Sequence, residues 1–253
     1  MRQNAALAKW RRNEPSVGAW LSLGNVHVAE MIANAGFDWV CIDLQHGLIE
    51  YGDLLRMLPA ISTTETTPLV RVASNNLPEI NKVLDAGAMG VIVPLVNTAE
   101  QASAAVSACL YPPDGTRSFG PTRAAMWGGR GYAQEANGQI ACIVMVETQE
   151  GLDNLDAIVA TPHLGGVYVG PADLALSLGL PARGDTDEPR HLAAVERILA
   201  ACKRQRVPAG IHTGSLEWAK RRLAMGFDFV TLGTDAGFMM QAVTADLAAV
   251  RGG

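Results

Sequence analysis

Residues 141–174 read ACIVMVETQEGLDNLDAIVATPHLGGVYVGPADL, and this stretch decides the fold. It contains two short runs rich in β-branched residues, Ala141–Val146 and Gly165–Val169. Each run is too short for a helix and predicts a buried strand. Three apolar residues recur at helical spacing between the runs: Leu152, Leu155 and Ile158. The stretch therefore predicts a β–α–β unit, whose two strands are parallel.

A carboxylate follows each of these two strands, Glu147 after the first and Asp173 after the second. Parallel neighbours bring their carboxyl ends to one edge of the sheet, where α/β proteins place their chemistry. Two converging carboxylates suit a hard divalent cation such as Mg²⁺, which takes its other ligands from substrate and water. Taken singly, each acid is equally well explained as the start of a helix. Together with the residues below, the pair predicts a metal site.

The same alternation continues in both directions along the chain. Strand-like runs occur at Val17–Leu23, Trp39–Leu44, Pro68–Val72, Gly90–Val96, Ala141–Val146, Gly165–Val169, Ala209–His212 and Phe229–Leu232. Helix-like segments lie near residues 3–12, 26–35, 50–59, 77–85, 99–109, 149–160, 188–205, 215–225 and 236–250. Eight strands alternating with helices over 253 residues predict an α/β protein, a closed (β/α)₈ TIM barrel forming a single domain over residues 1–253.

Composition excludes several classes of protein. A net charge of −5 without a basic patch argues against nucleic-acid binding. The N-terminus lacks the apolar core of a signal peptide, and no apolar run is long enough to cross a membrane. Four cysteines without CxxC spacing predict buried, reduced thiols in a cytoplasmic protein: Cys41, Cys109, Cys142 and Cys202.

Other polar residues sit at predicted strand ends. Asp43 and His46 follow the second strand, and a histidine with a carboxylate partner suits general acid–base catalysis. Arg71 ends the third strand, where it either stabilises an anion or pairs with a neighbouring acid. His212 and Thr213 end the seventh and are expected to shape the pocket. The remaining histidines are expected to play ordinary surface roles: His27, His163 and His191.

The lysines exclude one mechanism. None of the four lies on a predicted strand or at its carboxyl end: Lys9, Lys82, Lys203 and Lys220. A Schiff-base aldolase needs a lysine inside the barrel, so a metal is left to polarise a carbonyl substrate.

Residues 111–138 interrupt the alternation with a long segment of little periodicity. Such segments are usually functional or belong to an interface. This one carries unusually many guanidinium and aromatic groups for a plain loop: Arg117, Arg123, Trp127, Arg130 and Tyr132. We expect it to form part of a site or an interface.

The chain resembles the metal-dependent pyruvate aldolases of the HpcH/HpaI family, of which 4-hydroxy-2-oxoheptanedioate aldolase is typical. The resemblance runs in register from about residue 17 to residue 248. Its motifs are GAWLSLGN, GFDWVCIDLQHG, LVRV, LDAGAMGVIVPLV, YPPDGTRSFGPTRA, VETQEGLDNL and VGPADLALSLG. It implies a barrel with a swapped C-terminal helix, assembled into homohexamers as trimers of dimers.

The resemblance also implies roles for individual residues. Glu147 and Asp173 would hold Mg²⁺, Mn²⁺ or Co²⁺ as the cofactor. Pyruvate would chelate that ion, its carboxylate held by backbone groups near Gly170 and Ala172. Arg71 would stabilise the enolate.

Further roles implied by the resemblance concern proton transfer and the long segment. His46 would act as the base, through a water and supported by Asp43, and Asp85 would tune that histidine. Arg123 would contact substrate or an interface. Asp85 ends a predicted helix, which lies at the opposite face of the barrel unless the residue acts from another subunit.

Two positions depart from the family pattern. Gln45 stands where some relatives have Glu, and Met145 stands where some have Gln. A thioether does not make the hydrogen bonds of an amide, so the substrate contact at Met145 is expected to differ.

The sequence thus predicts a carbon–carbon lyase that cleaves or forms 4-hydroxy-2-oxo acids, with pyruvate or hydroxypyruvate and an aldehyde as its small-molecule partners. Two alternatives remain open. A CoA-thioester lyase is disfavoured because no obvious basic residues would hold the CoA phosphates. A non-catalytic 2-oxo-acid-binding protein is compatible with the fold alone.

Overall fold

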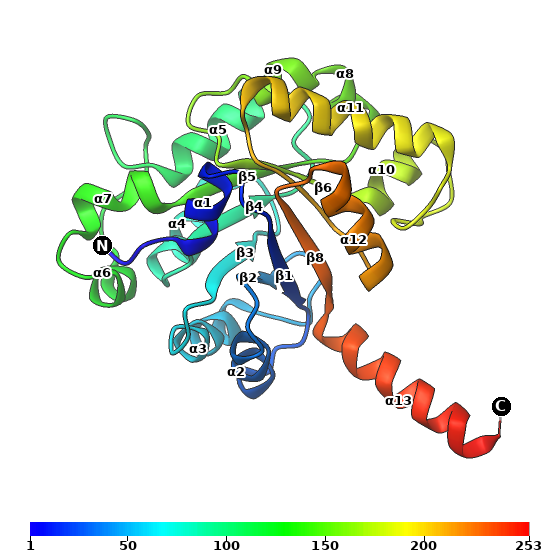
Figure 1. The fold of residues 1–253 in the computed structure, drawn as a ribbon. Helices are drawn as coiled ribbons and strands as arrows, with labels where there is room; N and C mark the ends of the chain where they lie inside the picture. Colours follow the sequence, from blue (N-terminus) through cyan, green and yellow to red (C-terminus); the bar gives the residue numbers. More distant parts are fainter. Residues whose placement is uncertain (253) are drawn as a thin grey trace.

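The computed structural model, which describes residues 1–252, contains a closed barrel of parallel strands paired in chain order (Figure 1). The strands are β1 (Ser16–Leu21), β2 (Trp39–Asp43), β3 (Thr67–Arg71), β4 (Gly90–Val93), β5 (Ala141–Val146), β6 (Gly166–Val169), β7 (Ala209–Ile211) and β8 (Phe229–Thr234). The pairing of β8 with β1 closes the barrel. The predicted single-domain (β/α)₈ barrel is confirmed.

Helices alternate with these strands and surround the barrel (Figure 1). They are α1 (Ala5–Arg11), α2 (Val26–Asn34), α3 (Tyr51–Ile61), α4 (Leu77–Asp85), α5 (Ala99–Cys109), α6 (Thr122–Gly128), α7 (Tyr132–Gln139), α8 (Gln149–Asp153), α9 (Leu155–Val159), α10 (Pro171–Ser177), α11 (Pro189–Gln205), α12 (Leu216–Met225) and α13 (Asp235–Arg251).

The helices differ from prediction in three places. The segment 111–138 contains α6 and most of α7, whose small residues and glycines give little amphipathic periodicity. The helix predicted over 149–160 is broken at Asn154 into α8 and α9. Helix α10 was not predicted, and it begins with Pro171 at its first position, where the missing N–H costs nothing.

Local sequence explains where many helices begin and end. The side chains of Asn25, Thr98 and Ser215 each precede a helix and accept hydrogen bonds from its first-turn N–H groups. Gly226 ends α12 at φ 103°, a left-handed conformation that glycine adopts without steric cost. The three N-terminal caps set strand-to-helix turns at the carboxyl ends of the strands, where the site described below lies.

Apolar side chains form two layers, one between barrel and helices and one inside the barrel. The inner layer includes Leu7 and Trp10 of α1, so the N-terminal helix covers one end of the barrel. Trp10 stacks on Phe229 with ring centroids 4.3 Å apart. The opposite end, formed by the carboxyl ends of the strands, holds the pocket described below.

Helix α13 extends away from the barrel (Figure 1). One stripe of it exposes large apolar side chains: Met239, Met240, Val243, Leu247 and Val250. No helix within residues 1–252 is long and apolar enough to cross a membrane.

Candidate active site

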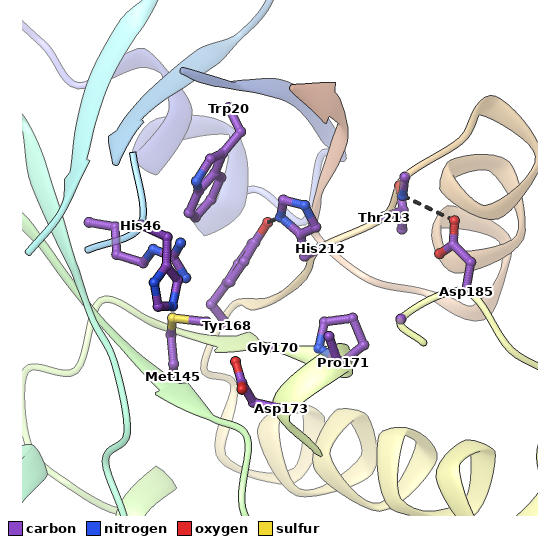
Figure 2. A pocket seen from close by; sticks show the side chains of 14 residues that line it. Trp20, His46, Met145, Tyr168, Gly170, Pro171, Asp173, Asp185, His212 and Thr213 are labelled. Atoms are coloured by element: carbon purple, nitrogen blue, oxygen red, sulfur yellow. Dashed lines mark hydrogen bonds between the residues drawn. The ribbon is translucent and has the colours of Figure 1, made fainter. Parts of the chain in front are cut away.

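A cavity of about 340 Å³ opens at the carboxyl ends of the strands (Figure 2). Its lining combines residues from the ends of β1, β2, β3, β5, β6 and β7 and from the loops that follow them. The lining residues are Trp20, His46, Arg71, Met145, Tyr168, Gly170, Pro171, Ala172, Asp173, Gly184, Asp185, His212, Thr213 and Gly214. Most of the residues predicted for the site are therefore brought together.

The Glu147 carboxylate lies beside this cavity and is 2% exposed. Its Oε1 accepts a 2.8 Å hydrogen bond from the N–H of Leu95, but its buried Oε2 has no hydrogen-bond partner within residues 1–252. Burial raises the pKa of Glu147 to about 7, and the negative charge of Asp173 adds to this rise. A buried carboxylate oxygen without a donor is costly, so it points to a ligand.

The backbone at Gly170 leaves room for that oxygen. A Cβ added to Gly170 would lie 2.0 Å from Glu147 Oε2 and 2.9 Å from Met145 Cε. A side chain at this position would therefore displace the carboxylate. Asp173, three residues on, is exposed in the first turn of α10 and lines the cavity. The two acids follow strands β5 and β6, which are adjacent and parallel as predicted.

Arg71 and Asp43 are paired across β2 and β3, where they are register partners. Arg71 donates two hydrogen bonds to Asp43, from Nε to Oδ1 at 2.9 Å and from Nη2 to Oδ2 at 2.6 Å. Burial alone would raise the pKa of Asp43, but the guanidinium holds it below its ordinary value. The arginine also lies over the ring of Trp20, 5.0 Å from its centroid. Its remaining nitrogen, Nη1, makes no hydrogen bond within the described residues.

His46 lines the cavity but lacks the carboxylate partner that its sequence context predicted. The structure shows no hydrogen bond between its imidazole and Asp43 within residues 1–252. Asp43 instead accepts hydrogen bonds from the main-chain N–H groups of Gln45 and His46, at 3.0 and 3.2 Å. Its carboxylate also accepts the two hydrogen bonds from Arg71. An aspartate that ends a strand is well placed to accept the N–H groups of the turn that follows. Asp43 thus positions the backbone that carries His46.

Aromatic side chains form one wall of the cavity (Figure 2). Trp20 stacks on Tyr168, and His212 meets the edge of Trp20 at 5.1 Å between centroids. The Tyr168 hydroxyl lies within hydrogen-bonding distance of Thr231 Oγ1 and, at 3.4 Å, of His212 Nδ1. Burial, helped by the charge of Arg71, lowers the pKa of His212 to about 4, so this imidazole is neutral near pH 7.

The two positions that depart from the family pattern have different locations. Met145 is 2% exposed and lines the same cavity as His46 (Figure 2). Gln45 does not line the cavity. A thioether accepts only weak hydrogen bonds, so Met145 presents an apolar surface to a ligand.

Two residues implied by the family resemblance lie far from the cavity of this chain. Asp85, at the C-terminal end of α4, accepts a 2.7 Å hydrogen bond from buried Arg117. Arg123 donates to the carbonyl of Ala86 at 2.6 Å and to Ser62 Oγ at 2.8 Å, at the ends of α4 and α3. Helices run opposite to strands in this fold, so both positions lie at the face away from the pocket.

Sequence reasoning missed several pocket residues. Trp20 and Tyr168 belong to β1 and β6. An aromatic residue that points into the barrel gives the same sequence pattern whether it lines a pocket or packs in the core. Asp185 lies in an aperiodic loop between α10 and α11, which carries no local signal of a site. It accepts a 3.0 Å hydrogen bond from the N–H of Gly214 (Figure 2).

The surface role expected for His191 was wrong. This side chain is 0% exposed, and its Nε2 lies 2.9 Å from the carbonyl oxygen of Pro171. It lies on the inner face of α11, where an imidazole is small enough to pack among apolar residues and reach the α10 turn.

A profile of the family described as HpcH/HpaI aldolase/citrate lyase matches residues 16–242. The chain belongs to this family. It is 40% identical over 246 residues to the hydroxypyruvate/pyruvate aldolase of Rhizorhabdus wittichii, with 96% of each protein covered. It is 38% identical over 244 residues to the 2-dehydro-3,6-dideoxy-6-sulfogluconate aldolase of Pseudomonas putida, covering 96% of this chain and 95% of that protein.

A crystal structure of an HpcH/HpaI family protein from Burkholderia cenocepacia has the same fold. It superposes with a TM-score of 0.92 at 37% identity, over 98% of this chain and all of the other. Together with the curated aldolases, this relationship identifies the chain as a carbon–carbon lyase of the HpcH/HpaI family. The non-catalytic and CoA-thioester alternatives are not favoured.

Proposed function

We propose that this HpcH/HpaI aldolase cleaves and forms 4-hydroxy-2-oxo acids, with pyruvate or hydroxypyruvate as the oxo acid. One observation carries the proposal: the unpartnered Oε2 of Glu147 lies beside a cavity that also presents Asp173, Arg71 and His46. Acids, a fixed cation and a histidine around one cavity are the groups that carbon–carbon cleavage next to a carbonyl requires.

The donor set fits a divalent ion, Mg²⁺, Mn²⁺ or Co²⁺. Glu147 and Asp173 would hold it, since hard cations prefer carboxylate oxygens and accept few protein ligands when substrate supplies the rest. Within residues 1–252, no group of three or more His, Cys, Asp or Glu side chains could coordinate a metal ion together. When bound, the ion supplies Lewis acidity to the keto oxygen of the substrate.

The other residues act on substrate charge and on the proton. Arg71, fixed by Asp43, keeps Nη1 free to donate to the oxygen that becomes negative as the C–C bond breaks. His46 would exchange the proton with C3 of the oxo acid, directly or through a water. Backbone groups near Gly170 and Ala172 would hold the substrate carboxylate. No side chain of the described residues caps the N-terminus of α10, so the N–H groups of its first turn are free to donate hydrogen bonds.

Residues distant from the cavity are assigned to assembly. We propose a homohexamer, a trimer of dimers in which α13 packs on a neighbouring copy, supported by the stripe of exposed apolar side chains on that helix. In such an assembly Asp85 and Arg123 would act at or across subunit interfaces. The four free, buried cysteines support a cytoplasmic location.

The test follows exchange of the pyruvate methyl protons in D₂O by NMR, which needs no aldehyde. We expect exchange in the presence of Mg²⁺ or Mn²⁺, loss of it after EDTA, and recovery when the ion is restored. His46→Gln should abolish exchange while retaining Mn²⁺ binding measured by calorimetry. Exchange that survives thorough chelation would contradict the assignment of Glu147 and Asp173.

A further inference from the structure

The cavity has two ends with different chemistry. At one end lie His46, Met145 and Arg71, where the oxo acid is assigned. Figure 2 shows Asp185 and Thr213 on the other side of the pocket, away from His46 and Met145. His46 and Arg71 act on the oxo acid at the first end, which leaves the second end for the acceptor aldehyde.

Asp185 is held in a fixed position at that end. Its Oδ2 accepts a 3.0 Å hydrogen bond from the N–H of Gly214 and a 3.4 Å one from Ser215 Oγ. Its Oδ1 accepts none from the described residues, so this oxygen is available to a ligand. The Thr213 hydroxyl is not available to donate to a ligand, because it already donates a hydrogen bond to the carbonyl oxygen of Thr231. The free side-chain group at this end is therefore a hydrogen-bond acceptor with negative charge.

Burial raises the pKa of Asp185 and the nearby guanidinium groups of Arg222 and Arg221 lower it, but no lysine or arginine lines this end of the cavity. Among the lining residues the only lysine or arginine is Arg71, which already makes two hydrogen bonds to Asp43. Arg222 lies near Asp185 but is 1% exposed and does not line the cavity. The imidazole of His212 is neutral near pH 7.

We propose that Asp185 selects the acceptor aldehyde: the enzyme takes a neutral, hydroxylated aldehyde and rejects one that carries a carboxylate, phosphate or sulfonate at its far end. A hydroxyl group donates to Oδ1, whereas an anion meets the like charge of Asp185 in a partly desolvated site, where repulsion is strong. This inference rests on the proposed aldolase function and adds the class of its second substrate.

The test compares two aldehydes of matched length, 4-hydroxybutanal and succinic semialdehyde, each with pyruvate and saturating Mn²⁺. 4-Hydroxybutanal closes largely to a cyclic hemiacetal in water, so kcat/KM is calculated from the open-chain concentration of each aldehyde, measured by NMR. On this basis the wild-type kcat/KM should be at least tenfold higher for the hydroxyl-bearing aldehyde. Asp185→Asn keeps an acceptor for the N–H of Gly214 and removes the charge, and it should reduce this ratio at least fivefold. Because the ratio is taken within each variant, a general loss of activity does not affect it.

Asp187→Asn is the matched control, because Asp187 lies in the same loop, pairs with Arg221 on the surface and does not line the cavity. It should leave the ratio unchanged. A wild-type preference for succinic semialdehyde, or a ratio that Asp185→Asn does not alter, would overturn the role of Asp185 while aldol activity stands. Absence of both methyl-proton exchange and aldol addition would instead refute the proposed function, and this inference with it.

Discussion

The Nε2 atom of His191 donates a 2.9 Å hydrogen bond to the carbonyl oxygen of Pro171, two residues before the proposed metal ligand Asp173. The imidazole is completely buried on α11, and its Nδ1 has no partner within residues 1–252. Burial lowers the pKa of His191, which favours the neutral ring. The bond links the outer helix α11 to the turn that carries Ala172 and Asp173.

We expect His191→Ala to weaken Mn²⁺ binding by about tenfold, the usual effect of losing a group that orients a metal ligand. It should also destabilise the protein by about 1–3 kcal/mol, because the Pro171 carbonyl loses its donor. Calorimetric titration and thermal unfolding measure the two effects. His191→Gln, which keeps a donor, should recover part of the affinity, and the exposed His27→Ala serves as control. Unchanged Mn²⁺ affinity in His191→Ala would show that the bond is only structural.

The pair of Arg71 and Asp43 leads to a second prediction. Arg71→Lys keeps the charge but cannot reproduce the two-pronged bond to Asp43 while also donating to substrate. We expect the rate of pyruvate methyl-proton exchange to fall by about 10²-fold, as when one oxyanion donor is lost, with Mn²⁺ affinity unchanged.

Arg56→Lys is the control for that experiment, because Arg56 pairs with Asp53 at the exposed surface. It should exchange protons at the wild-type rate. If Arg71→Lys retained full activity, the guanidinium would have no part in stabilising negative charge on the substrate.

The raised pKa of Glu147 leads to a prediction of how the stability of the metal-free protein depends on pH. Its pKa of about 7 in the folded state exceeds its ordinary value of 4.5. The unfolded chain therefore releases this proton first, and the folded state loses stability as pH rises from about 4.5 to about 7. The loss is up to about 3 kcal/mol, since each pH unit of difference corresponds to 1.36 kcal/mol.

Thermal unfolding of the EDTA-treated protein at pH 5 and pH 7.5 measures this effect. Glu147→Gln should abolish the part of the pH dependence that this carboxyl contributes, and Mn²⁺ at pH 7.5 should restore the stability of the wild type but not of the variant. If the metal-free wild type and Glu147→Gln showed the same change in stability between pH 5 and pH 7.5, the raised pKa of Glu147 would be contradicted.

The apolar stripe on α13 predicts assembly through this helix. Val243 and Leu247 are 45% and 46% exposed and lie one turn apart. We expect the double variant Val243→Asp, Leu247→Asp to form smaller particles than the wild type in sedimentation velocity, because it places charge in an apolar contact. Thr244→Asp changes the same helix outside the stripe and should sediment like the wild type. A monomeric wild type would disprove the proposed hexamer.

The barrel was predictable because each strand and helix carries its own pattern. The β-branched runs, the helical periodicity and the capping residues act locally, so the element order could be read one segment at a time. Helix α10 escaped prediction because seven residues that start with Pro-Ala-Asp also fit a turn. The two short helices α6 and α7 escaped because a buried stripe is hard to recognise in segments rich in Gly and Ala.

The sequence by itself determined which residues end the strands, and so it brought Glu147, Asp173, Arg71 and His46 to one rim. It did not determine the partners of these residues. Only the tertiary structure pairs Asp43 with Arg71 and not with the His46 imidazole. It also leaves Glu147 Oε2 without a partner among residues 1–252 and buries His191 against Pro171. It alone brings Asp185 to the pocket. Strand order follows from local periodicity, whereas side-chain partners depend on distances between segments far apart in the chain, which no local pattern encodes.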